Sequence, residues 1–302
     1  RKRQGPRKRN GPMIAAIASG KGGTGKTTVA ASLAAVWKGP LTAADLDVEA
    51  PNLHLFLKAE IAGRLEISMM IPKVDESRCN YCGACSDICQ FKAISVLGQV
   101  MLTLPEMCHG CGACMAVCPE EAISEGSRPL GEIIWGRRGD IDCLAGRLRV
   151  GEAMSPPLIG HVKDAAEKAA SERGADLIYD APPGVSCPAM KAVTGADIIV
   201  LVTEPTPFGL YDLKLAVNSF AAFKRPMGVV VNRAGIGNDK VYDYCRQKGL
   251  PLLAEIPFTR SAAEAYSKGL ILAEAFEEHR ERFAVLAEEI RRRSVCAGEV
   301  TA

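Results

Sequence analysis

The residues with the clearest chemical potential lie in a glycine-rich loop near the start of the sequence. This loop contains, in order, Gly20, Lys21, Gly22, Gly23, Thr24, Gly25, Lys26, Thr27 and Thr28. Because glycine has no β-carbon, backbone N–H groups of such a loop can close around phosphate oxygens, and a following helix adds the positive end of its dipole. The G-x-x-x-x-G-K-T spacing is typical of a nucleotide phosphate loop. We expect Lys26 to contact the β- and γ-phosphates and the Thr27 hydroxyl to bind Mg²⁺.

Eight of the twelve cysteines form a second reactive set. The run Cys79, Cys82, Cys85 and Cys89 recurs 29 residues later as Cys108, Cys111, Cys114 and Cys118. This offset indicates an internal duplication with approximate two-fold symmetry. A disulfide framework would need an export signal, which is not visible. Thiolates are suitable ligands for the iron of iron–sulfur clusters. Zinc is the competing metal, but zinc ribbons would leave the third cysteine of each run unexplained.

The cysteine spacing resembles that of the bacterial ferredoxins with two [4Fe–4S] clusters, in which the fourth cysteine of each run binds the other cluster. The resemblance implies one cluster on Cys79, Cys82, Cys85 and Cys118, and another on Cys108, Cys111, Cys114 and Cys89. Gln90 stands where that pattern prefers proline, so we expect a looser turn there. We interpret Cys143, Cys187, Cys245 and Cys296 as free thiols.

Lys21, within K-G-G-x-G-K-T-T, resembles the deviant Walker A lysine of the MinD/ParA ATPases, a group that includes Mrp-type iron–sulfur carriers and the nitrogenase iron protein. The resemblance implies that Lys21 reaches across a nucleotide-bound homodimer to the phosphates of the other subunit, much as an arginine finger does. The alternative for Lys21 taken alone, which we consider less favoured, is a solvated loop lysine. The same family positions its attacking water with an aspartate like Asp47, and Asp45 is then a supporting or Mg²⁺-side carboxylate.

Three later segments extend this resemblance. Asp180 ends an apolar run and corresponds to the Walker B carboxylate, which holds Mg²⁺ directly or through water. Gly184 follows in D-x-P-P-G and corresponds to a switch whose amide senses the γ-phosphate. Asn232 and Arg233 resemble an adenine-contacting pair, and Pro257 is expected to line the base pocket.

Alternating strands and helices must position these residues. Apolar runs predict strands at 13–18, 41–46, 176–180, 197–203, 226–232 and 252–256, and helices are expected at 29–37, 158–173, 209–223, 239–248 and 274–293. This alternation favours an α/β fold with a mostly parallel sheet covered by helices on both faces. We therefore predict a P-loop NTPase domain formed by 13–71 and 126–295, with a small ferredoxin-like α+β insertion at 72–125.

Composition limits the remaining possibilities. No apolar run reaches the roughly 18 residues of a membrane span, so we expect a cytoplasmic protein. The net charge of +2 depends on six basic residues in the first nine; without them 31 basic residues face 35 acidic ones. We expect residues 1–12 to be a disordered basic tail, and 296–302 a second tail. Binding of nucleic acid by the basic tail is a weaker alternative.

These patterns lead to one principal hypothesis and two alternatives. The first is an ATP-hydrolysing, Mg²⁺-dependent enzyme whose nucleotide-gated homodimer drives iron–sulfur or metal cofactor assembly by handing a cluster to an apo-metalloprotein. The second is an ATP-gated electron donor to a redox partner. The third is a spatial organiser of the MinD/ParA kind that binds DNA or membrane.

Overall fold

The computed structural model describes residues 12–296, which form two compact units. The first unit contains the residues up to Arg64, Ile133–Arg147 and the chain from Ile159 onward; the second contains Leu65–Glu132 and Leu148–Leu158. The second unit is thus wider than the expected insertion at 72–125. The predicted tails at 1–12 and 296–302 fall outside the described residues, except for Pro12 and Cys296.

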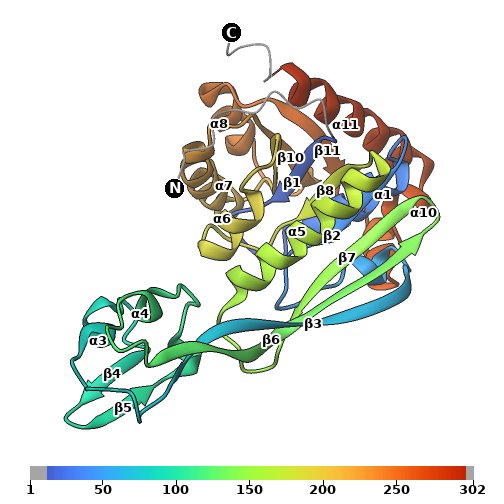
Figure 1. Cartoon of the computed structure of the whole chain (residues 1–302). Coiled ribbons are helices and arrows are strands. Elements are labelled where there is room, and N and C mark those ends of the chain that lie inside the picture. Colours follow the sequence, from blue (N-terminus) through green and yellow to red (C-terminus); the bar gives the residue numbers. More distant parts are fainter. Residues whose placement is uncertain (1–11, 297–302) are drawn as a thin grey trace. The chain divides into compact units, whose positions relative to one another are not determined.

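The first unit is built on a largely parallel sheet, which confirms the predicted fold class (Figure 1). Its strands follow the order β11-β10-β9-β1-β8-β2-β7-β6-β3. Their bounds are β1 (Ile14–Ala18), β2 (Leu41–Asp45), β3 (Glu60–Val74), β6 (Ile123–Arg138), β7 (Ile141–Leu148), β8 (Asp176–Asp180), β9 (Ile198–Thr203), β10 (Met227–Ala234) and β11 (Leu252–Pro257). Every pair from β11 to β7 in this order is parallel. Strands β3 and β6 continue from the first unit into the second.

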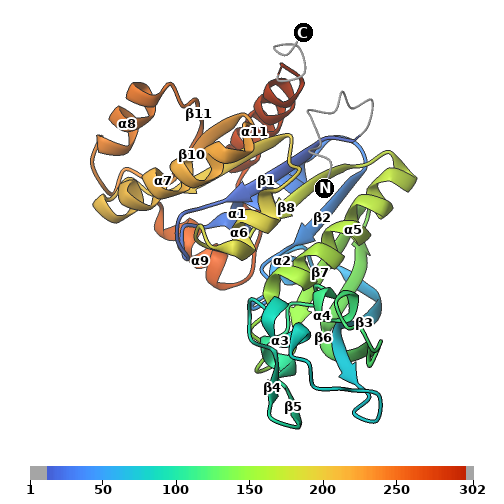
Figure 2. The same ribbon diagram turned by 60° about the vertical axis from the view of Figure 1, so that its left-hand side comes forward.

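Helices cover both faces of this sheet (Figure 2). They are α1 (Lys26–Val36), α2 (Leu53–Phe56), α5 (Ser155–Arg173), α6 (Cys187–Val193), α7 (Pro207–Phe220), α8 (Lys240–Lys248), α9 (Arg260–Ser267), α10 (Leu272–Ala275) and α11 (Glu277–Cys296), with a 3₁₀ turn at Ala221–Phe223. One core joins sheet residues such as Ile17 and Val200 to Leu33 of α1 and Phe283 of α11. Because strand side chains alternate, neighbours such as Leu201 are buried on the opposite face.

The second unit is small and internally duplicated. It contains α3 (Ala84–Ile88), an antiparallel hairpin of β4 (Ile94–Leu97) and β5 (Val100–Thr103), a 3₁₀ turn (Pro105–Met107) and α4 (Ala113–Ala116). Gly83 and Gly112, 29 residues apart, precede the two helices with φ angles of 84° and 73°, a left-handed conformation that glycine adopts without strain. The sequence repeat is therefore also a repeat of backbone conformation.

A buried ion pair fastens the returning segment Leu148–Leu158 to the rest of the second unit. The Arg128 Nη2 atom donates to Glu152 Oε1 at 3.2 Å, and both side chains are almost fully buried. Glu152 also accepts from the amide of Met154. No helix within residues 12–296 is long and apolar enough to cross a membrane.

Candidate functional site

Three neighbouring strands of the first unit bring the predicted phosphate-binding residues together. Strands β1, β8 and β2 lie side by side and parallel, so their carboxyl ends meet at one edge. Asp180 at the end of β8 is the register partner of both Ile17 in β1 and Asp45 in β2. The glycine loop leaves β1 after Ala18 and α1 begins at Lys26. Ligands of open α/β sheets bind at this position, outside the carboxyl ends of the strands.

Ser19 organises the glycine loop internally. Its hydroxyl accepts a hydrogen bond from Lys26 Nζ at 2.9 Å and donates to the carbonyl oxygen of Lys21 at 2.5 Å. Its own carbonyl oxygen accepts from the amide of Gly184 at 3.1 Å. Burial lowers the pKa of Lys26, although the carboxylates of Asp180 and Asp47 oppose that effect. The lysine is therefore held in the loop, facing acidic groups.

Asp180 is a fully buried carboxylate with unused acceptor positions. Among residues 12–296, neither of its oxygens has a hydrogen-bond partner of ordinary geometry. Desolvation raises the pKa of Asp180 to about 7, although the Thr27 hydroxyl and Lys26 lower it. A buried carboxylate without partners is costly unless a cation neutralises it, and oxygen ligands suit Mg²⁺. Thr27 and Asp180 therefore fit the Mg²⁺ site expected from the sequence.

Asp45 and Asp47 differ in environment despite their closeness in sequence. Asp45 is buried, and its carboxylate accepts from the amides of Asp47, Asn52 and Leu53 at 2.7–3.0 Å. These bonds shape the turn that leads into α2. Burial and the neighbouring Asp180 raise the pKa of Asp45 well above its usual range. Burial raises the pKa of the half-buried Asp47, although Lys26 and a hydrogen bond from the Ala50 amide in the same turn oppose that effect.

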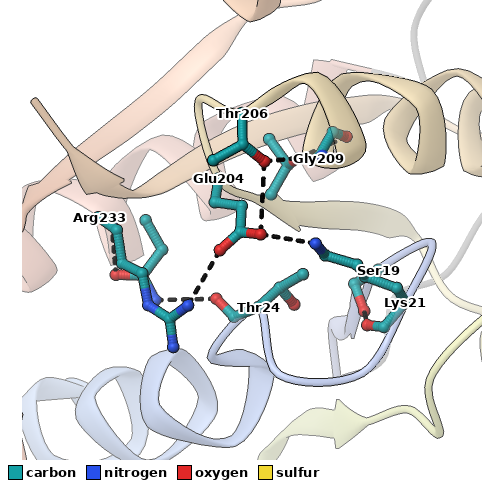
Figure 3. Close-up of polar contacts among 9 residues, drawn as sticks. Ser19, Lys21, Thr24, Glu204, Thr206, Gly209 and Arg233 are labelled. Atoms are coloured by element: carbon teal, nitrogen blue, oxygen red, sulfur yellow. Dashed lines mark hydrogen bonds and ion pairs between the residues drawn. The ribbon is translucent and has the colours of Figure 1, made fainter. Parts of the chain in front are cut away.

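Glu204 links two predicted nucleotide residues in the same chain (Figure 3). Its Oε1 atom lies 2.6 Å from Lys21 Nζ, and its Oε2 atom lies 3.0 Å from Arg233 Nη1. Burial alone would raise the pKa of Glu204, but the hydrogen bonds and charges of Lys21 and Arg233 outweigh it and hold the pKa below its ordinary value. Lys21 is thus engaged within its own subunit.

The predicted base-contacting residues line a cavity beside the loop. Gly23, Gly25, Asn232, Arg233 and Pro257 are among its lining residues, and its empty volume, mouth included, is about 980 Å³. Asn232 Nδ2 donates to the carbonyl oxygen of Thr24 at 2.8 Å. A β-carbon at Gly25 would collide with that amide group, and Gly25 has a φ of +93°. Strand β10 shifts its register with β11 after Asn232, and Arg233 has a φ of 55°.

Two functional candidates, Ser19 and Glu204, were missing from the sequence prediction. Ser19 lies just before the motif. Glu204 follows β9, whose register with β1 pairs Ala18 with Leu201. An acidic residue directly after a buried strand that ends at the phosphate edge was a usable signal. The following Thr206, which caps α7 by accepting from the Gly209 amide at 3.0 Å, marks that strand end.

The eight cysteines of the second unit divide between two cavities. The first cysteine cavity is lined by Cys79, Cys82, Cys85 and Cys118. The second cysteine cavity is lined by Cys89, Cys108, Cys111 and Cys114. Each cavity therefore gathers three cysteines of one run and the fourth of the other, which is the crossed grouping predicted above.

Backbone amides point at four of these sulfurs. Tyr81 N lies 3.4 Å from Cys79 Sγ and Gly110 N lies 3.4 Å from Cys108 Sγ. Ala93 N lies 3.3 Å from Cys89 Sγ, and Ala122 N lies 3.3 Å from Cys118 Sγ. In the part of the chain that the structure describes, no three His, Cys, Asp or Glu side chains converge closely enough to hold a single metal ion. Each cavity is lined by four thiols, and amides are directed at two sulfurs of each set, which is donor chemistry of the kind that an iron–sulfur cluster requires.

Three comparisons with known proteins each found similar chains. Residues 15–272 match the family described as the CobQ/CobB/MinD/ParA nucleotide binding domain. An uncharacterized protein of Methanocaldococcus jannaschii, MJ0578, is 37% identical over 228 residues, which cover 75% of this chain and 80% of that protein. The crystal structure of the Pyrococcus furiosus cell division ATPase MinD is 22% identical, with a TM-score of 0.57 and coverage of 93% of this chain and 98% of that one. MinD from Pyrococcus horikoshii, complexed with Mg-ADP, gives a TM-score of 0.55 at 22% identity, covering 92% and 96%.

Proposed function

The chain belongs to the CobQ/CobB/MinD/ParA nucleotide-binding family, and from that premise we propose that it is a Mg²⁺-dependent ATPase that holds two [4Fe–4S] clusters and donates electrons to a protein partner under nucleotide control. The gathering of the eight cysteines into two crossed sets of four carries the iron–sulfur half of this proposal. The phosphate edge of the sheet carries the nucleotide half.

In the nucleotide half, Lys26 and the loop amides hold the phosphates, while Thr27 and the unpaired carboxylate of Asp180 hold Mg²⁺. Asp45 supports this site by fixing the turn that carries Asp47. Asp47 orients the attacking water. The base occupies the cavity lined by Asn232, Arg233 and Pro257. The similarity in fold to an archaeal MinD that binds Mg-ADP supports this assignment.

Lys21 acts between two copies of the chain. In a nucleotide-bound homodimer it leaves Glu204 and reaches the phosphates of the other subunit, where its charge stabilises the developing negative charge. Glu204 then holds Lys21 only in the unpaired state. Gly184 also exchanges one contact for another when nucleotide binds. Its amide must leave the Ser19 carbonyl oxygen before it can donate to a γ-phosphate.

In the iron–sulfur half, each cysteine cavity supplies four thiolates, and the directed amides stabilise sulfur charge. A bound [4Fe–4S] cluster supplies a one-electron couple. All four ligands of each set come from this chain, which leaves no ligand position open for an acceptor. This closed arrangement favours the electron-donor hypothesis over the cluster-transfer hypothesis.

Chain connectivity supports coupling between the halves. The chain leaves the first unit after Arg64, downstream of Asp47, and finally re-enters it at Ile159, upstream of Asp180. We infer that movement of these two γ-phosphate-facing segments is transmitted to the second unit through β3, β6 and α5, each of which runs from one unit into the other.

The test is anaerobic purification followed by quantitation of iron and acid-labile sulfide. Two clusters give about eight iron atoms per chain. Cys89→Ser and Cys118→Ser should each lose about half of that iron, from opposite cavities, whereas the control Cys187→Ser, at an exposed cysteine in the first unit, should keep all of it. Bound zinc, or full iron content in both crossed variants, contradicts the proposal.

The same preparation separates the two iron–sulfur hypotheses. Incubation with ATP and an apo-acceptor protein should leave its iron content unchanged if the clusters carry electrons. Depletion of iron under those conditions would replace electron donation with cluster transfer.

The fold likeness to the cell division ATPase MinD also supports, more weakly, a role as a spatial organiser. The full chain and a chain without residues 1–12 can be compared for binding to DNA and to anionic lipid vesicles. Binding through the basic head should weaken steeply with salt. No binding by the full chain excludes this alternative.

A further inference from the structure

The duplication of the second unit allows the two cysteine cavities to be compared position by position, if they hold clusters as proposed above. With an offset of 29 residues, Asn80 corresponds to His109, Phe91 to Glu120, and Lys92 to Glu121. Matched positions should give matched cluster properties. Any difference at these positions therefore separates the two sites.

Hydrogen bonding to the cysteine sulfurs does not distinguish the two cavities. The first cysteine cavity contains the amide contacts to Cys79 and Cys118, at 3.4 and 3.3 Å. The second contains the contacts to Cys108 and Cys89, also at 3.4 and 3.3 Å. Since amide bonds to sulfur are a principal determinant of reduction potential, this influence is nearly equal in the two sites.

Solvent exposure and apolar lining do not separate them either. Each set of four cysteines has one exposed, one buried and two half-buried members. Apolar side chains face both cavities; they include Val96, Met101 and Ile123 in the first, and Met70, Ile71 and Met115 in the second. The burial of the ligating sulfurs is therefore similar in the two cavities.

The two cavities differ in the charged side chains beside them. Glu120 lines the first cavity, and its Oε1 atom accepts a hydrogen bond from Asn80 Nδ2 at 2.9 Å. At the equivalent place in the second cavity, Phe91 stacks on His109, with ring centroids 3.4 Å apart and planes at 11°. The next residue is Glu121 in one repeat and Lys92 in the other.

One nearby cation reduces this charge difference without removing it. Arg78 Nη2 lies 3.8 Å from Glu121, and both side chains are largely exposed, so this pair offsets Glu121. The Asn80 bond orients the Glu120 carboxylate without neutralising it. The exposed carboxylate of Glu120 therefore leaves a negative charge beside the first cavity, whereas no acidic side chain lines the second.

We propose that Glu120 makes the cluster of the first cavity the harder of the two to reduce, so that a single electron resides in the second cavity. Adding an electron next to a carboxylate is opposed by Coulomb repulsion, whereas Phe91 presents no charge at the equivalent position. One electron from a low-potential reductant reduces one cluster by one unit, and no proton or atom is transferred. Electrons would then leave the second unit from the second cavity, on the side that carries Phe91.

The experiment is a redox titration of the anaerobically purified full-length protein with dithionite, followed by electron paramagnetic resonance. Wild-type protein should show two steps in which the second cavity is favoured about tenfold, or about 59 mV for a one-electron couple. The variants Cys82→Ser and Cys111→Ser, at exposed ligands of the first and second cavities, assign each step.

Substitutions at the matched positions then test the cause. Glu120→Gln should raise only the lower potential, and Phe91→Glu should lower only the higher one. The double variant Glu120→Phe with Phe91→Glu should reverse the order. Glu106→Gln, at an exposed acid that lines neither cavity, is the control and should change neither potential.

Two kinds of failure can be distinguished. Protein that holds no iron overturns the proposed function itself. Protein with full iron content but equal potentials, the reverse order, or no response to Glu120→Gln overturns the role of Glu120 and leaves the proposed function standing.

Discussion

The ammonium group of Lys21 and the carboxylate of Glu204 form an ion pair within one chain, with 2.6 Å between Nζ and Oε1. Glu204 is mostly buried and also binds Arg233. For Lys21 to act on the phosphates of another subunit, as proposed above, its ammonium group must move away from Glu204. Under that proposal, pairing of two chains around nucleotide breaks this contact in both of them.

Glu204→Gln should therefore strengthen ATP-dependent dimerisation. Loss of a partly exposed ion pair of about 1 kcal/mol predicts roughly a fivefold gain in the dimerisation constant for each chain. Analytical ultracentrifugation with a non-hydrolysable ATP analogue measures the gain. Glu288→Gln, which breaks the exposed Lys38–Glu288 pair, is the matched control. Equal dimerisation of Glu204→Gln and wild-type protein argues against a restraining role for Glu204.

Asp47→Ala should trap the ATP-bound dimer. Without a carboxylate to orient water, hydrolysis slows while the phosphate-binding residues stay intact. Gel filtration with Mg-ATP should show a persistent dimer, and phosphate release should fall steeply. Glu49→Ala, at an exposed acid in the same turn, should cycle normally. Rapid dissociation of the Asp47→Ala dimer after ATP addition would exclude this role.

Asp180→Asn should weaken Mg²⁺ binding and slow turnover. This change removes the buried charge that we assign to the cation, and a loss of about 3 kcal/mol of charge stabilisation lowers the rate by about 100-fold. Steady-state phosphate release at several Mg²⁺ concentrations measures the effect. Asp164→Asn, at an exposed position on α5, should behave as wild type. Normal turnover by Asp180→Asn at limiting Mg²⁺ refutes the assignment.

Cys143 should stay protonated and unreactive in the folded protein. Desolvation and then Asp142 raise its pKa from 9.0 to about 12, against a smaller opposite effect of Arg138. Above pH 9 the unfolded thiol ionises while the folded thiol keeps its proton, so stability falls as pH rises, by about 1.4 kcal/mol at pH 10. Denaturation of wild type and Cys143→Ala at pH 8 and pH 10 should show this difference. Equal pH dependence of the two proteins contradicts it.

Sequence patterns were sufficient to predict the strands from β11 to β2 in the sheet, but not the three strands β7, β6 and β3 at its other edge. Strands β1, β2, β8, β9 and β10 have short runs of buried residues, which mark a parallel sheet covered on both faces. Strand β3 is largely exposed and mixes glycine, charged and apolar residues, so neither period is visible. Strands β3, β6 and β7 were not predicted from the sequence, and neither was the extent of the second unit.

The sites were predictable where chemistry requires fixed spacing in sequence. The glycine loop and the cysteine runs have such spacing, and the cysteines that the ferredoxin resemblance groups together line the same cavity. Ser19 and Glu204 act through contacts that depend on the fold. Glu204 lies 183 residues from Lys21, so no local pattern could reveal their ion pair.

The most direct test of the account is the electron paramagnetic resonance spectrum of reduced, anaerobically purified protein with and without Mg-ATP. We predict signals from two [4Fe–4S] clusters whose line shape or potential changes when Mg-ATP is added, and a Lys26→Ala variant that shows the same signals without that change. Identical wild-type spectra in both conditions, with ATP shown to be bound, would contradict the claim that nucleotide state controls the clusters.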